Sequence, residues 1–262
     1  MTTWLFRAVS GIAASLLIVP MVLAAPAGQI SESVGNVTVT SAQQSPVSVK
    51  KGAAVDSGQV VTTGANGQAV IKFQDGQVIA LKSNSVFKIN SYKYDQAYPE
   101  KGESIFALLQ GGARAITGLI GERNKAGWRM ATPTATMGIR GTDFFIVIDQ
   151  ATYVNVNTGA VMATNQGGNL IVVANEAGVI SSASVAGVNV PLSSLPANLF
   201  AEIKAMSLTG ALGGPSAGAA GAAGTAAVGG VPAWVIGVGI AAGAGAAAAA
   251  GGGGDDSSTT HH

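Results

Sequence analysis

Arg140 is the residue of this sequence whose type and setting most suggest chemistry. It stands between two glycines in GIRGT, residues 138–142, directly before the apolar run FFIVI. A guanidinium offers five donors in one rigid plane, so it suits either an anionic ligand or several backbone carbonyls. Because an unpaired buried charge is costly, we predict that Arg140 lies inside the domain and holds together backbone turns that lack a sheet partner. Binding of an anionic ligand is the alternative.

The other residue types that catalysis requires do not form a pattern. The two histidines are the last two residues, and the aspartates are spread through turns and strand ends. GPSAG at 214–218 has the spacing of a hydrolase nucleophile turn, and GVGIAAG at 237–243 is similar to a dinucleotide-binding loop, yet neither joins a strand to a helix as such motifs must. We predict no catalytic residue, no metal site and no cofactor, and interpret the protein as not an enzyme. The aspartates concerned are Asp56, Asp75, Asp95, Asp143 and Asp149.

The charge and cysteine content exclude further classes. The net charge is +1 and only 10% of the residues are charged, so the sequence predicts no nucleic-acid partner. The densest basic segment, residues 112–129, carries Arg114, Arg123, Lys125 and Arg129, and we interpret it as a solvated loop. With no cysteine, the protein has no disulfide, and its stability must come from an apolar core.

Short runs rich in valine, isoleucine and threonine predict strands at residues 35–42, 46–52, 68–74, 77–89, 143–149, 151–159 and 169–180. The pairs Asn66-Gly67 and Asp75-Gly76 supply the left-handed backbone that tight hairpins need. Alternation in 68–74 predicts one buried and one wet face. The uninterrupted apolar run in 143–149 instead predicts a strand that is covered on both sides.

These strands, with no helical pattern between them, predict an all-β domain at residues 28–190. We expect a compact β-solenoid or jelly-roll-like body, with a sandwich as alternative. Residues 191–208 follow as a short amphipathic helix, because Leu199, Ile203 and Met206 recur at helical spacing. We expect this helix to cover an open edge or end of the β body.

Both ends of the chain have a different composition from the β body. Residues 1–24 combine a positive residue, an apolar run and small residues near a cleavage position, which predicts a secretory signal peptide and an exported protein. Residues 209–230 are a Gly/Ala linker. The apolar segment from Val231 to Ala250 is long enough to span a bilayer but only weakly hydrophobic, so a membrane helix and a low-complexity spacer both stay open. Residues 251–262 are interpreted as a polar flexible tail.

The order of several motifs resembles the FecR-type periplasmic domain, named after the ferric-citrate regulator. The similarity covers roughly residues 55–168 and includes TTGANG, the DGQ turn, LLQGGARAI and RGT before an apolar strand. The resemblance implies an all-β, solenoid-like domain without known catalysis. It also implies that Asp75 and Gly76, together with Arg140, Gly141 and Thr142, are signature positions, which we interpret as structural.

Founding members of the resembled family carry signals from an outer-membrane receptor to a cytoplasmic sigma factor. The predicted signal peptide replaces their sigma-binding region, so we expect an exported, non-enzymatic binding or scaffold module at the cell envelope, periplasmic or at the surface. Its partner would be an envelope protein or a glycan. The segment from Val231 to Ala250 would associate with a membrane if it forms a helix and not a spacer. The alternatives are a periplasmic signalling component related to sigma-factor regulators, and a surface or matrix protein that assembles into homo-oligomers.

Overall fold

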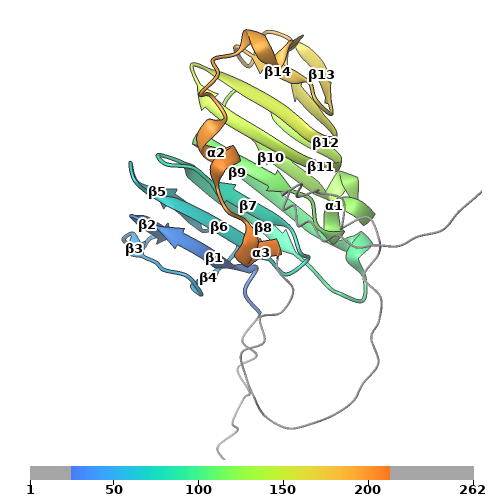
Figure 1. The fold of residues 1–262 in the computed structure, drawn as a ribbon. Helices are drawn as coiled ribbons and strands as arrows, with labels where there is room; N and C mark the ends of the chain where they lie inside the picture. The colour runs from blue at the N-terminus through green and yellow to red at the C-terminus, as the bar shows by residue number, and fades with distance from the viewer. Residues whose placement is uncertain (1–24, 213–262) are drawn as a thin grey trace, which may run out of the picture. The chain divides into compact units, whose positions relative to one another are not determined.

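A computed structural model describes residues 25–212, and within this range the chain is mostly β-sheet (Figure 1). The strands are β1 (Gly28–Val34), β2 (Val37–Thr40), β3 (Val47–Ser48), β4 (Ala54–Val55), β5 (Val60–Thr63), β6 (Gln68–Phe73), β7 (Val78–Leu81), β8 (Val86–Lys93), β9 (Glu103–Ile116), β10 (Trp128–Ala131), β11 (Thr136–Asp149), β12 (Ala151–Asn165), β13 (Gly168–Val173), β14 (Ala177–Ile180) and β15 (Val188–Val190). The α-helices are α1 (Leu119–Arg123), α2 (Ala201–Ala205) and α3 (Thr209–Leu212), and the 3-10 helices are η1 (Pro99–Lys101), η2 (Lys125–Gly127) and η3 (Leu192–Ser194).

All strands of the described range belong to one mixed, open sheet. Its main path runs β15-β14-β12-β11-β10-β9-β7-β6-β1-β4. The strand β13 joins this path at β12, and a branch β3-β2-β5-β8 joins it at β9. The β9–β10 pair is parallel, whereas the other pairings in this range are antiparallel. The predicted all-β class is therefore confirmed for the described residues, while the finer β-solenoid and jelly-roll alternatives stay predictions.

Three long strands, β9, β11 and β12, change partners halfway along their length. The first half of β11 pairs with β10 and the second half with β9, and a register shift separates Arg140 from Asp143. Gly141 has φ +57° in this shift, and Gly159 has φ +80° on the neighbouring strand β12. Residues with a side chain rarely adopt such a backbone, so these glycines permit the bulge at which the sheet bends.

The bend brings two parts of the sheet against a shared apolar core. Phe73 of β6 stacks at 5.1 Å from Tyr92 of β8 and at 5.2 Å from Phe106 of β9, and Trp128 of β10 meets Phe144 of β11 at 5.9 Å. The strand β6 is hydrogen-bonded to neither β8 nor β9, whereas β10 and β11 are neighbours in the sheet. Tilted and edge-on rings at such distances are the favoured aromatic arrangements, so aromatic side chains join the two parts.

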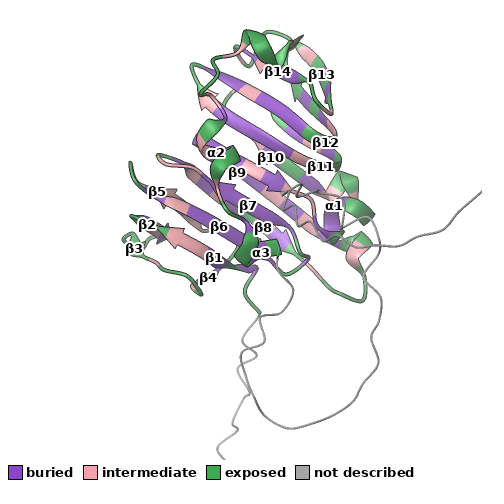
Figure 2. Ribbon diagram, viewed as in Figure 1, coloured by how far each residue is buried: buried purple, intermediate pink, exposed green. Residues whose placement is uncertain are grey.

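The segment that carries α2 and α3 lies across the outer face of one part of the sheet (Figures 1 and 2). Phe200 and Ile203 of this segment pack on Phe145 and Val147 of β11. Leu208 and Ala211 pack in the same way on β6 and β7. The prediction that 143–149 is covered on both sides is confirmed, because its alternate residues enter the central core. The helix α2 covers a face of the sheet rather than the edge or end that the sequence suggested.

Glu202 attaches α2 to the sheet. Its carboxylate accepts hydrogen bonds from the backbone N–H of Ser83 at 2.7 Å, from the Ser83 hydroxyl at 2.9 Å and from Gln68 Nε2 at 3.2 Å. Lys82 Nζ lies 3.6 Å from Glu202 Oε2. Partial burial by itself raises the pKa of Glu202, but these hydrogen bonds and Lys82 outweigh it and hold the pKa below the ordinary value.

We expect Glu202→Gln to lower the free energy of unfolding by about 1 kcal/mol at neutral pH, because charged hydrogen bonds are replaced by neutral ones. A carboxylate whose pKa is lowered by folding stabilises the protein above its ordinary pKa, and this contribution disappears as the pH falls through the folded value. The difference between wild type and Glu202→Gln should therefore shrink on acidification in urea titrations. Glu100→Gln, at an exposed glutamate, is the control; equal losses in both variants would contradict the anchoring role.

Several sequence predictions differ from the structure in detail. Gly76 has a positive φ as expected, whereas Asn66 and Gly67 do not. Gly67 is required for a different reason, since a Cβ there would lie 2.2 Å from the Asn36 carbonyl oxygen. The outer face of β6 is only partly wet, because α3 covers Val70. The strands β1, β4, β5, β9, β10 and β15 were not predicted.

Membrane and export predictions fall largely outside the described range. No helix within residues 25–212 is both long and apolar enough to cross a membrane. The predicted signal peptide at 1–24, most of the linker at 209–230, the apolar segment at 231–250 and the tail at 251–262 lie outside the described residues.

Candidate functional site

The side chain of Arg140 is exposed on the outer face of β11. Its guanidinium makes no hydrogen bond or ion pair with any described residue. The prediction of a buried clamp at this position is therefore wrong. In the first half of β11, Met137 and Ile139 face the core, so Thr136, Gly138 and Arg140 must face outward. The α2–α3 segment packs over the second half of β11 and not over this one.

Arg114, which the basic pattern of residues 112–129 placed in a solvated loop, is instead the more covered of the two arginines and is partly buried. It lies on β9, and its Nε and Nη2 donate to the two carboxylate oxygens of Asp143 at 2.8 and 2.7 Å. The two side chains are only 20% and 15% exposed. The guanidinium also lies 5.2 Å from the ring centre of Phe145, and Asn157 Nδ2 donates to Asp143. A bidentate pair of this kind specifies geometry as well as energy, and here it connects β9 to β11.

The clearest sequence signal for Arg114 was the alternation around it. Ala113 and Ala115 point into the core on either side of it, so Arg114 must point to the outer face of a strand. Residues 112–129 were interpreted as one basic loop, although their first five residues are the end of β9. The alternation of the strand was therefore overlooked.

Thr142 fixes the bulge that follows Arg140. Its backbone N–H donates to the hydroxyl of Thr117 at 2.9 Å, and its carbonyl accepts from both the N–H and the hydroxyl of Thr117 at 2.9 Å. Thr142 itself is only 4% exposed. Gly141, beside it, occupies the left-handed region, and a Cβ at Gly141 would meet no atom within 4 Å. The backbone on the C-terminal side of Arg140 is therefore tightly held, although the Arg140 side chain is free.

Asp75 is buried in the turn between β6 and β7. Its carboxylate accepts hydrogen bonds from Tyr92 Oη at 3.1 Å, from the N–H of Gln77 at 3.2 Å and from the N–H of Ile120 at 3.2 Å. Its carbonyl accepts from the N–H of Leu119 at 2.9 Å. Burial raises the pKa of Asp75, and the hydrogen bonds oppose that effect without cancelling it. Asp75 thus holds the start of α1.

The signature positions meet at one short segment. Thr117 bonds Thr142, and two residues further on Leu119 and Ile120 bond Asp75. Gly118 lies between Thr117 and Leu119 and packs closely against the β6–β7 turn. A Cβ at Gly118 would lie 2.4 Å from the backbone nitrogen of Gln77. Gln77 in turn accepts a hydrogen bond from the indole of Trp128. The structure therefore ties Asp75 and Thr142, each with a neighbouring signature glycine, to the same segment 117–120, and leaves the Arg140 side chain pointing away from it.

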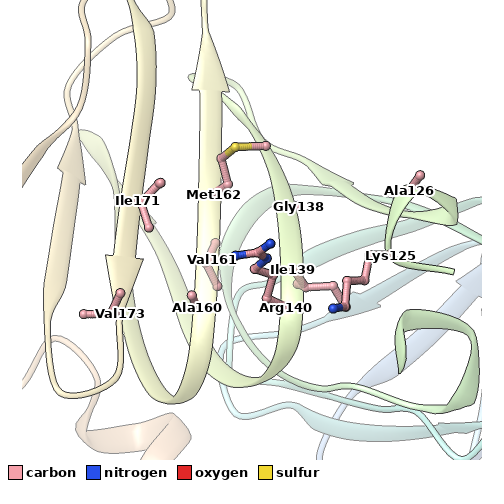
Figure 3. A pocket seen from close by; sticks show the side chains of 10 residues that line it. All are labelled: Lys125, Ala126, Gly138, Ile139, Arg140, Ala160, Val161, Met162, Ile171 and Val173. Carbon is pink, nitrogen blue, oxygen red and sulfur yellow. The ribbon is translucent and has the colours of Figure 1, made fainter. Parts of the chain in front are cut away.

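Arg140 borders a groove on the outer face of β11, β12 and β13, with a volume of about 550 Å³ (Figure 3). Its walls include Met162, Ile171 and Val173, apolar side chains that are 48%, 57% and 42% exposed. A second hollow of about 450 Å³ shares Lys125, Gly138 and Met162 with it and continues towards Arg129. An apolar hollow with a few charged groups at its border is the usual form of a ligand or partner site.

The described residues offer no alternative site with catalytic or metal-binding geometry. Within residues 25–212, no three side chains of histidine, aspartate or glutamate lie together as a metal would require. Asp75 and Asp143 are both used in structural hydrogen bonds, and Asp56 accepts from the backbone of Ala27. The remaining candidate, the border of the groove at Arg140, is suited to binding an anion rather than to transferring protons.

The described residues thus form a β-sheet domain with an exposed groove that is bordered by cations. Comparison with protein families identifies part of this domain, because residues 59–162 match the family model described as FecR protein. These residues form a FecR domain, as the ordered motifs predicted. The match contains the Asp75 turn, the RGT segment and the part of the groove lining that ends at Met162.

Two solved structures are similar to part of the chain. They are crystal structures, at 1.65 and 2.50 Å resolution, of a "putative anti-sigma factor" from Parabacteroides distasonis ATCC 8503. Each is 15% identical, covers 50% of this chain and 59% of its own, and has a TM-score of 0.41. The chain thus spans little more than half the length of these structures. The comparison with curated proteins gave no similar sequence.

Proposed function

We propose that this protein is an exported, non-catalytic FecR-domain module that binds a partner at the cell envelope and contributes to signalling there. One observation carries the proposal. The bulge that follows Arg140 is fixed by hydrogen bonds between Thr117 and Thr142, while the Arg140 side chain itself is presented to solvent beside an apolar groove. A purely structural arginine would be expected to use its donors within the domain.

The family supports the signalling part of this proposal, and the sequence supports the location. Residues 59–162 are a FecR domain, and the family resembled by this sequence transmits signals across the envelope. The N-terminal signal peptide predicted at residues 1–24 accounts for export. The partner in this proposal is an envelope protein or a glycan that the groove contacts directly.

The experiment combines fractionation with cross-linking in the native host. A photo-reactive amino acid at position 162, on the wall of the groove, should cross-link a partner in the envelope fraction, and Arg140→Glu should reduce the yield several-fold. The same substitution should leave the free energy of unfolding within about 0.5 kcal/mol of wild type, because Arg140 is exposed and unpaired among the described residues.

Lys51→Glu, at an exposed lysine on the turn before β4, is the matched control for charge reversal. It should leave the cross-link unchanged. Recovery of the full-length protein in cytosol, or a cross-link that is equally strong in Arg140→Glu, would contradict the proposed function. A large loss of stability in Arg140→Glu would restore the structural interpretation of this arginine.

A further inference from the structure

The groove owes its shape to two cross-strand rows on the outer face of β11, β12 and β13. In the first row Gly138 lies opposite Met162, which lies opposite Ile171. In the second row Arg140 lies opposite Ala160, which lies opposite Val173. Side chains in such rows stand about 5 Å apart. Because Gly138 and Ala160 are small, the face is hollow at these two positions and bordered by taller side chains.

Cations border this groove along its whole length. Arg140 lines the first hollow, Arg129 lines the second, and Lys125 lines both. No aspartate or glutamate lines either hollow. The three cations form no ion pair with any described residue. Arg129 does feel the charge of Glu103, whose pKa it helps to lower. The groove border itself carries only positive side chains beside an apolar floor, in a protein whose overall charge is only +1.

The spacing of the cations distinguishes between two kinds of anionic occupant. An amphiphile with one anionic head would need a cation at one end of the groove and apolar side chains along the rest. Here three positive groups come from three different elements, Arg140 from β11, Lys125 from η2 and Arg129 from β10, and line two hollows that share residues. From Arg140 to Thr136 the floor extends four residues, about 13 Å of strand. A chain carrying several carboxylates at intervals complements this arrangement better than a single head group does.

We propose that the groove binds an acidic peptide segment of a partner protein in extended conformation, with apolar side chains that alternate with its carboxylates. In an extended chain successive side chains point to opposite sides. The segment would therefore lie over Gly138 and Ala160 with one side towards the apolar side chains of Met162, Ile171 and Val173. Its other side would turn the carboxylates towards Arg140, Lys125 and Arg129. This inference rests on the proposed function, and it specifies the chemistry of the partner.

The direct test uses purified protein and labelled synthetic peptides in fluorescence anisotropy. The probe alternates glutamate with valine and leucine over seven residues, and two matched peptides replace either every glutamate by glutamine or every apolar residue by serine. We expect the first peptide to bind at least about tenfold more tightly than either control. Its affinity should fall when the salt concentration is raised from 0.05 to 0.5 M.

Two variants attribute the binding to the groove. Gly138→Val fills the hollow; the glycine has no positive φ, and a Cβ there would meet only the Met162 carbonyl oxygen at 3.9 Å, so the fold should tolerate the change. Arg140→Glu reverses a charge of the border. Each should weaken binding of the acidic peptide by at least about tenfold, whereas Lys51→Glu should not. Circular dichroism melting of every variant shows that the fold is retained.

The outcomes separate this inference from the function on which it rests. Equal binding of the glutamate and glutamine peptides, or unchanged binding in Gly138→Val, would overturn the acidic-peptide inference. If dodecyl sulfate binds in an Arg140-dependent manner and the acidic peptide does not, the groove takes a single-headed amphiphile and the inference is wrong. If the peptides fail while the cross-link at position 162 persists in cells, the proposed binding function stands and only the chemistry of the partner is incorrect.

Discussion

Asp75→Ala is expected to lower the free energy of unfolding by about 3 kcal/mol, the larger of the effects that follow from the signature residues. The substitution removes the acceptor for Tyr92 Oη and for the backbone N–H groups of Gln77 and Ile120. Asp75 is only 3% exposed, so water does not simply replace the carboxylate. The start of α1 and the β6–β7 turn should loosen together. Urea denaturation followed by tryptophan fluorescence measures the change.

Two further measurements make this prediction specific to Asp75. Asp75→Asn should cost less than Asp75→Ala, because one amide oxygen still accepts from Tyr92 and Gln77, although the amide nitrogen then faces the N–H of Ile120. The raised pKa of Asp75 gives the opposite pH dependence from Glu202. A folded state that holds the proton more tightly gains stability below the unfolded pKa and loses it as the pH rises through the folded value. The advantage of wild type over Asp75→Ala should therefore increase towards acidic pH. A cost under 1 kcal/mol that does not vary with pH would contradict the buried network.

Gly159→Ala is expected to lower the free energy of unfolding by about 3 to 5 kcal/mol, for a steric reason. Gly159 has φ +80°, and a Cβ there would lie 2.1 Å from the carbonyl oxygen of Gly141 and 2.6 Å from that of Arg140. These are backbone atoms of the bulge that Thr142 and Thr117 hold in place, so they cannot move aside cheaply. Guanidinium denaturation of the purified variant measures the loss.

Gly141→Ala is the matched control, since both glycines lie at the same bend. Its φ of +57° is also unfavourable for alanine, but a Cβ at this position would meet nothing within 4 Å. Gly141→Ala should therefore lower the free energy of unfolding by only about 1 kcal/mol, the penalty for placing alanine at a positive φ without any steric clash. Equal costs for the two substitutions would show that the close approach of β12 to the bulge is not what limits Gly159.

These predictions assign different roles to residues that are adjacent in the sequence. Asp75, Gly141 and Thr142 hold the turn and the bulge in shape, and their loss should be seen as instability. Arg140 is carried by the same bulge but contributes to none of its hydrogen bonds through its side chain, and its loss should be seen in binding. A substitution scan across 138–142 would therefore give two classes of variant, which separate in melting experiments.

The sequence by itself determined the class of the domain, several of its turns and the strand at its centre. Strong local signals explain this success. Asp75-Gly76 must turn because glycine accepts a positive φ, and the uninterrupted apolar run in 143–149 must be covered on both sides because either face would otherwise expose large side chains to water. The ordered motifs were also sufficient to identify the FecR domain at 59–162.

Only the tertiary structure decided which arginine is buried. Alternation along a strand shows that Arg114 and Arg140 both point away from the core, but it does not show what covers that face. Arg114 pairs with Asp143 close to where the α2 segment packs on the outer face of β11. Over Arg140 the described chain instead leaves a groove. The α2 segment comes almost ninety positions after Arg114 in the chain, and its approach depends on how the long strands fold over one another. Burial of a charge is set by such distant contacts, so local pattern could not predict it.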